Sequence, residues 1–173
     1  MNKLFFYVVV LLSTCYSSYA QRKSEQKQID PSQIPSAVKT SQSTAFPTVT
    51  GTRWEVRDVI ANRKYVTKYV AVFTTDNTTI HARYKGDGTL VSSSKYFDGE
   101  HAPSQIKNLG SKYNEYTLKS AEEIKTYAKG KVFYRAHFYK GKKKTLVYTD
   151  DSGKEIANEK VLVEVREEEE NEN

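Results

Sequence analysis

The stretch from Lys131 to Tyr148 constrains the fold of this chain most strongly, because its side chains alternate in character on both sides of one turn. Successive side chains of a β-strand point to opposite faces of a sheet. From Val132 to Tyr139 one face therefore carries only Val, Tyr, Ala and Phe, while the other carries aromatic and basic side chains. Gly141 stands inside a lysine-rich turn, and the apolar alternation resumes at Leu146. This pattern predicts a β-hairpin.

A second hairpin is predicted earlier in the chain. Tyr69 to Phe73 alternates, Asp76-Asn77 supplies a turn, and Ile80 to Tyr84 alternates in return. A proline opens a short segment of helical spacing before each hairpin region, at Pro35 and at Pro103. Because the order of elements occurs twice, we predict an α+β fold that is a tandem repeat of two units, each a helix packed on a small antiparallel β-meander sheet. The expected units are residues 33–97 and 98–163.

One segment of the second unit carries conflicting signals. Ser120-Ala121-Glu122-Glu123 has the spacing of a helix capping box, which favours a helix as far as Ala128. The repeat favours a strand, because the matching segment of the first unit is predicted as one. We follow the repeat, since local propensity is weak against tertiary context.

The first 20 residues have the pattern of a secretory signal peptide. Lys3 is followed by an apolar run from Leu4 to Leu12, and Ser18-Tyr19-Ala20 places small residues where a signal peptidase cleaves. The run is much shorter than the roughly 20 residues that span a bilayer. We expect cleavage after Ala20; the alternative is a lipoprotein signal that ends at Cys15. Both interpretations predict export.

Two polar segments flank the predicted units. Residues 21–32 lack periodicity, so we expect a disordered spacer. Residues 164–173 hold six Glu and one Arg, so we expect an acidic disordered tail. Of the formal net charge of +6, Lys3 contributes +1 and residues 161–173 contribute −5, so residues 21–160 carry +10. A basic body of this kind is able to bind polyanions.

The familiar catalytic and metal-binding motifs are absent from the sequence. Cys15, the single cysteine, lies in the segment expected to be removed. His81, His101 and His137 do not have the spacing of a zinc site, and the sequence has neither a Gly-x-Ser-x-Gly elbow nor a phosphate-binding loop. We therefore expect no enzymatic activity, no cofactor and no metal site.

Several short motifs carry a resemblance to a known family. They are Ile34-Pro35, Phe46-Pro47, Trp54-Glu55 and the turn from Tyr84 to Gly88, followed by a weaker second copy. On these motifs the chain, from Pro35 to Lys160, resembles the bacterial PepSY-like proteins that are similar to β-lactamase-inhibitor protein. The resemblance implies tandem helix-on-sheet units and a periplasmic or secreted binding or inhibitory module. The second copy departs from the pattern at Gly110 and at Tyr113-Asn114, and it lacks a second Trp.

A helix covers only one face of the sheet on which it packs, so we expect one face to be buried and the other to be open. The residues expected beneath the helices are Tyr69, Ala71, Phe73, Val132, Tyr134, Ala136 and Phe138. The residues expected on the open face, where they would bind a protein partner, are Val70, Val72, His81, Arg83, Phe133, Arg135, His137 and Tyr139. Three alternatives stay open: these residues fill a seam between the units, they lie on a solvated sheet face without a binding role, or a one-residue shift exchanges the two faces.

These features together predict an exported module that binds another exported protein, in its specific form binding or inhibiting a secreted or periplasmic hydrolase. We expect a monomer in the periplasm or outside the cell, without nucleic acid as a partner and without a transmembrane segment in the mature chain. One alternative is binding of a polyanion or envelope polysaccharide by the basic hairpin tip; another is a non-catalytic structural role in the envelope. The tip residues are Lys140, Lys142, Lys143 and Lys144.

Overall fold

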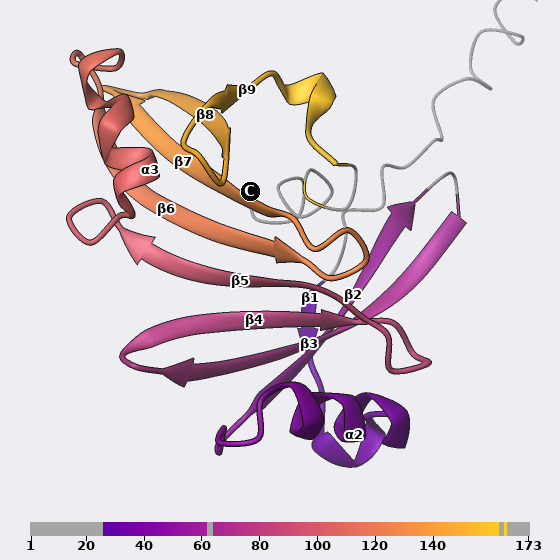
Figure 1. Cartoon of the computed structure of the whole chain (residues 1–173). Coiled ribbons are helices and arrows are strands. Elements are labelled where there is room, and N and C mark those ends of the chain that lie inside the picture. Colours follow the sequence, from indigo (N-terminus) through magenta and orange to yellow (C-terminus); the bar gives the residue numbers. More distant parts are fainter. Residues whose placement is uncertain (1–25, 62–63, 163–164, 166–173) are drawn as a thin grey trace, which may run out of the picture.

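The computed structural model describes residues 26–61, 64–162 and 165 (Figure 1). Nine strands form one antiparallel sheet in which each strand pairs with its neighbours in sequence. They are β1 (Gln26–Gln28), β2 (Arg53–Ala61), β3 (Lys64–Thr75), β4 (Thr78–Tyr84), β5 (Leu90–Asp98), β6 (Thr117–Thr126), β7 (Val132–Lys140), β8 (Lys143–Asp150) and β9 (Glu155–Ile156). The helices are η1 (Pro31–Gln33), α2 (Ser36–Ala45), α3 (Ser104–Lys107), η2 (Asn108–Ser111) and η3 (Asn158–Lys160), where η marks a 3-10 helix.

Both predicted hairpins form. β3 pairs with β4, and the turn between them places Asp76 and Asn77 in the left-handed conformation. β7 pairs with β8, and Gly141 has a φ of 58° at the tip. Turn residues with positive φ suit the right-handed twist of two-stranded ribbons, which is why these short sequences predict hairpins reliably.

The sheet is continuous across the middle of the chain. β5 pairs with β6 from Ser92 opposite Thr126 to Asp98 opposite Ser120. The prediction of a tandem α+β repeat of helix-on-meander units is therefore wrong: the protein is a single nine-stranded antiparallel sheet with two short α-helices. If the two units were separate sheets, β5 and β6 would be edge strands, each with a row of backbone N–H and C=O groups without partners. The pairing of β5 with β6 gives these groups hydrogen-bond partners. The boundaries at 33–97 and 98–163 stay a prediction.

The segment with conflicting signals is a strand. β6 runs through the capping-box residues, with Ala121 opposite Ala136 and Glu122 opposite Arg135. Ala121 is buried in the cluster that also holds residues of α3, and Glu122 is buried on the other face. Because both faces of this segment are packed, tertiary contacts outweigh the local preference for helix.

Both α-helices pack on one face of the sheet, which we call the helix face. α2 lies beside β3 and β4, where Val38 packs with Trp54 and Phe73, and α3 lies beside β6 and β7, where Ile106 packs with Phe138 (Figure 1). The residues predicted to lie beneath the helices do lie on the helix face, so the predicted alternation is confirmed for them. Ala71, Phe73, Tyr134, Ala136 and Phe138 are buried, and Tyr69 and Val132 are partly buried against the same clusters.

A buried hydrogen bond anchors α2 to the sheet. Val38 and Gln42 are four residues apart, so both lie on the helix side that faces the strands. The Tyr84 hydroxyl donates to Gln42 Oε1 at 2.6 Å. Burial raises the pKa of Tyr84, so the hydroxyl stays protonated and keeps its role as donor throughout the physiological range.

The described structure extends beyond the expected units at both ends. Within the expected spacer, residues 26–28 pair with β2 as β1, and Asp30 caps η1 by accepting from the Ser32 amide. Val165, within the expected tail, is buried. The predicted signal peptide, residues 21–25 and residues 166–173 lie outside the described residues. Across the described ranges, none of the helices is both long enough and apolar enough to cross a membrane.

Candidate functional site

The face of the sheet turned away from the helices, here called the opposite face, collects the buried charge of the protein. Antiparallel partners point to the same face of a sheet. The register therefore places Glu55, Val70 and Arg83 on one face, and it pairs Arg57 with Lys68. Every charged side chain that is buried in the described part of the chain lies on this face: Glu55, Arg57, Lys68, Arg83, Glu122 and Arg135.

Glu122 lies between two arginines that have almost no contact with water. Its carboxylate pairs with the guanidinium of Arg135 and lies 3.8 Å from that of Arg83. The side chains of Arg135 and Arg83 are 0% and 1% exposed. Arg83 also donates to Ser94 Oγ at 2.7 Å and to Tyr96 Oη at 3.1 Å. We call Arg83, Glu122 and Arg135 the ion triad. Its guanidinium–carboxylate contacts, which form only in a defined orientation, link β4, β6 and β7.

A second buried carboxylate, that of Glu55, lies at the other end of this face. Glu55 lies 2.9 Å from Arg53 and 3.6 Å from Arg57. The Arg53 side chain is half-exposed, whereas Glu55 and Arg57 are buried. Lys68 is buried opposite Arg57 on the neighbouring strand. The cations of β2 and β3 therefore lie close together on the opposite face.

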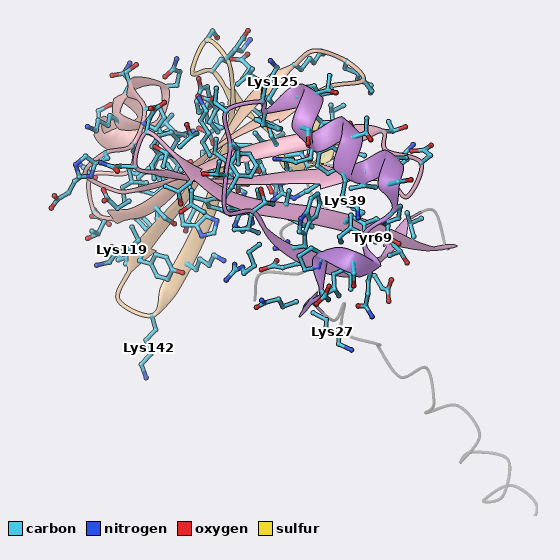
Figure 2. The ribbon with its side chains drawn as sticks, turned by 90° about the horizontal axis from the view of Figure 1, so that it is seen from below. Lys27, Lys39, Tyr69, Lys119, Lys125 and Lys142 are labelled. Carbon is cyan, nitrogen blue, oxygen red and sulfur yellow. The ribbon has the colours of Figure 1, made fainter. Side chains whose placement is uncertain are left out.

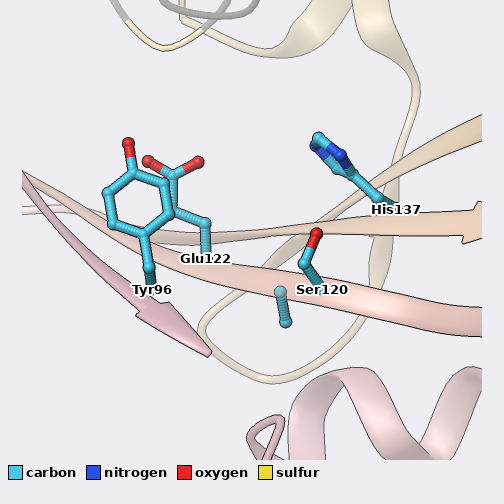
Figure 3. A pocket seen from close by; sticks show the side chains of 5 residues that line it. Tyr96, Ser120, Glu122 and His137 are labelled. Carbon is cyan, nitrogen blue, oxygen red and sulfur yellow. The ribbon is translucent and has the colours of Figure 1, made fainter. Parts of the chain in front are cut away.

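A small cavity of about 60 Å³ opens next to the ion triad (Figure 3). Tyr96, Ser120, Ala121, Glu122 and His137 line it. Figure 3 shows the Tyr96 ring beside the Glu122 carboxylate, with His137 across from them and Ser120 between. The His81 ring packs on Tyr96 with 4.7 Å between the ring centroids. The cavity is large enough for ordered water or a small polar side chain.

Residues near the C-terminus pack over another part of the opposite face. Val161 and Val165 are buried in a cluster with Ile124, Phe133 and Tyr148, and Leu162 is partly buried against it. We call Val161, Leu162 and Val165 the C-terminal strap. It covers the part of the face built by β6, β7 and β8, so only the remainder is accessible.

The eight residues predicted for the open face are on one face, as expected, but most of them are not open. Val70, Val72, Arg83, Phe133 and Arg135 are buried, and His81, His137 and Tyr139 are partly exposed. Phe133 is shielded by the C-terminal strap, and the arginines are held by Glu122. The expectation of an open face was too broad because the alternation shows which way a side chain points, not what packs over it.

The lysines of the hairpin tip are partly committed to local contacts. Lys140 pairs with Glu115, and the Lys143 ammonium lies 6.0 Å from the centre of the Tyr116 ring. A hydrogen bond from Lys143 lowers the pKa of Tyr116. Lys142 and Lys144 are exposed, and Figure 2 shows Lys142 projecting from the tip.

Three residues of the site were missed by the sequence analysis. Tyr96, Ser120 and Glu122 line the cavity, but the sequence predicted no role for them. The alternation along β6 indicates that Ser120 and Glu122 share a face. The pairing of β6 with β7, which brings Glu122 opposite Arg135, is a tertiary feature without a local signal.

The side chains around the cavity are of types that are suited to binding. The described residues contain no group of three or more His, Cys, Asp or Glu side chains that could hold a metal ion. Glu122, the carboxylate at the cavity, is engaged with two guanidinium groups. Ring faces, imidazoles and hydroxyls around a shallow cavity are suited to contacts with another polypeptide.

No protein-family model matches this chain, and no curated protein matches it. Solved structures match at the level of the fold. A protein from Bacteroides eggerthii, assigned to the periplasm on a provisional basis, matches with a TM-score of 0.60 and 14% identity, over 72% of this chain and 86% of that one. A DUF2874-family protein from Bacteroides uniformis matches with a TM-score of 0.58 and 15% identity, over 71% and 86%. A BLIP-like protein from Bacteroides fragilis matches with a TM-score of 0.58 and 16% identity, over 71% and 84%.

At these identities the likeness shows the fold alone. The chain has a BLIP-like fold, which confirms that part of the resemblance stated from the sequence. The PepSY-like part stays a prediction. A shared fold does not fix a shared function, so the function has to be argued from the site.

Proposed function

We propose that the protein is an exported binding module that takes a protein partner on the accessible part of the opposite face. The proposed contact residues, which we call the binding rim, are His81, Tyr96, Ser120, His137 and Tyr139. The observation that carries the proposal is a contrast in exposure: the rim is partly exposed, while the ion triad beneath it is buried. Contact groups held by a rigid layer lose little conformational entropy on binding.

Export is supported by two independent features. The pattern from Met1 to Ala20 is that of a signal peptide. A protein with the same fold, from Bacteroides eggerthii, is assigned provisionally to the periplasm. A finer proposal is that the partner is a secreted or periplasmic hydrolase; the resemblance to β-lactamase-inhibitor-like proteins supports it.

The test compares aromatic side chains on the two faces. We expect the double variant His137→Ala, Tyr139→Ala to lose about 2 kcal/mol of binding free energy, or roughly 30-fold in affinity, because buried aromatic contacts dominate protein interfaces. Tyr127 is the matched control, since it is an exposed aromatic residue on the helix face, where its hydroxyl lies 3.2 Å from that of Ser93. Tyr127→Ala should retain parental affinity.

The measurement is quantitative capture from an extract of the producing cells, with immobilised parent, rim variant and Tyr127→Ala side by side. Circular dichroism and thermal unfolding check that all three fold. A protein that the parent and Tyr127→Ala retain but the rim variant loses supports the proposal. Equal retention by all three baits contradicts it.

The hairpin tip supports a second candidate function, the binding of a polyanion. Lys142 and Lys144 are exposed, and Lys119 lies on the adjoining strand β6 near the same end of the sheet (Figure 2). Contacts made mainly by exposed lysines weaken steeply with salt. If captured material elutes with moderate salt and is lost on Lys142→Gln, Lys144→Gln, the tip is the binding site and the rim is not.

A further inference from the structure

The cavity beside the ion triad has a buried charged wall and a partly exposed mouth (Figure 3). Glu122 is 3% exposed, whereas Tyr96, Ser120 and His137 are partly exposed. All four line the same cavity. A side chain that enters from outside therefore passes between residues of the binding rim and ends beside the Glu122 carboxylate.

The size of the cavity fits one short side chain. Its volume is about 60 Å³. Roughly 10–15 Å³ of such space is enough for one water molecule, so the cavity has room for about four to six groups of that size. The end of an asparagine side chain, a CH2 group with its carboxamide, has four non-hydrogen atoms. An asparagine therefore fills most of the cavity, whereas an aromatic side chain is too large for it.

The charges around the cavity disfavour an occupant that carries a charge. Glu122 is the charged side chain that lines the cavity, and its carboxylate would repel an anion in contact with it. Arg135 pairs with that carboxylate and Arg83 lies 3.8 Å from it, so the triad as a whole carries +1 and opposes the entry of a cation. A neutral polar group meets neither penalty.

The lining offers both acceptors and donors of hydrogen bonds. A carboxylate accepts at about four positions, so Glu122 can accept from a further donor while it pairs with Arg135. The Ser120 hydroxyl both donates and accepts, and a neutral imidazole such as that of His137 has one donor and one acceptor nitrogen. A carboxamide matches this lining, because it has an NH2 group that donates and a carbonyl oxygen that accepts.

We propose that the cavity is a specificity pocket for the carboxamide of an asparagine side chain on the protein partner. The NH2 group donates to Glu122, and the carbonyl oxygen accepts from Ser120 or His137. An aspartate has the same shape but is rejected, because its charge would lie beside that of Glu122. The proposal rests on the proposed function for the source of the side chain, whereas the chemistry of the pocket is testable without a partner.

The experiment titrates the chain, without its predicted signal peptide, with three molecules of one shape and different charge. Acetamide is neutral, acetate is an anion and acetamidinium is a cation. Backbone amide NMR signals are followed at about pH 8, where imidazoles are neutral, up to about 0.1 M probe, because so small a ligand binds weakly. We expect acetamide to shift the signals of Ser120 and His137, with a dissociation constant at least about tenfold lower than those of the two charged probes.

Two variants place the binding in the cavity. Ser120→Val removes the hydroxyl and fills part of the space, so acetamide binding should be lost. Ser93→Val makes the same change on the helix face, where Ser93 lies opposite Lys125, and should leave acetamide binding unchanged. Circular dichroism and thermal unfolding check that both variants fold. The proposal is overturned if acetate binds the parent as tightly as acetamide, if acetamide causes no shifts, or if its binding survives Ser120→Val.

Two comparisons separate the source of the group and the two proposals. N-acetylglucosamine carries an acetamide group on a sugar, so tighter binding of this sugar than of acetamide overturns the assignment to a protein side chain. If the His137→Ala, Tyr139→Ala variant retains the captured protein while acetamide binds the parent, the proposed function fails and the chemistry of the pocket stands. If that variant loses the captured protein and acetamide does not bind, the pocket proposal alone fails.

Discussion

Replacing Glu122 with Gln should lower the free energy of unfolding by about 3–5 kcal/mol, the range expected when one partner of a buried ion pair is removed. The substitution keeps the size of the side chain and removes its charge. Two guanidinium groups, 0% and 1% exposed, then stay in the interior without the carboxylate that lies between them. Urea unfolding followed by Trp54 fluorescence measures the loss.

Glu123→Gln is the matched control. Glu123 is the next residue in β6, its side chain is 27% exposed, and it lies 3.8 Å from the half-exposed Lys95. Exposed pairs contribute less than about 1 kcal/mol, so this variant should be nearly as stable as the parent. If Glu122→Gln and Glu123→Gln unfold at the same urea concentration, the ion triad does not stabilise the fold as described.

Among the glycine-to-alanine substitutions, Gly99→Ala should be the most damaging. A Cβ at Gly99 would lie 2.1 Å from the carbonyl oxygen of Leu118 and 2.9 Å from its carbon. The Gly99 amide also donates to Lys119 O at 3.0 Å, so the backbone cannot withdraw without breaking the start of the β5–β6 pairing. Overpacking of this kind costs about 1–3 kcal/mol or more, and thermal unfolding will report it.

The control for this substitution is Gly110→Ala in η2. Nothing lies within 4 Å of a Cβ at Gly110, and its φ is not positive. Alanine there should leave stability unchanged or raise it by up to about 1 kcal/mol, since it restricts the unfolded chain. Equal destabilisation by the two substitutions would mean that the close approach of Gly99 to β6 does not exist.

The sequence predicts strand phase well, because the face to which each side chain points follows from a period of two. Ala136 and Arg135 were assigned to different faces, and the structure places them so. The turns are equally local: Asp76-Asn77 and Gly141 require positive φ and have it. What fails is the tandem-repeat arrangement, since β5 pairs with β6 in one continuous sheet and alternation does not name partners.

The candidate site depends mostly on features that the sequence cannot show. Glu122 reaches Arg83 only because β4, β5 and β6 are neighbours in one sheet. The strap is a related case. Val161 and Val165 are apolar, but the sequence does not indicate that they cover Phe133. Both features arise from packing between distant segments, and they decide how much of the opposite face is accessible.

Site-specific photocrosslinking would test the central claim, that the binding rim is where a partner binds. A benzophenone amino acid replaces Tyr139 on the rim in one chain and Tyr127 on the helix face in another, and both are irradiated in the producing cells. We predict a discrete crosslinked protein from position 139 and none from position 127, with the crosslink lost on His137→Ala. Crosslinking from position 127 alone, or to the same protein from both positions, would contradict the assignment of binding to the opposite face.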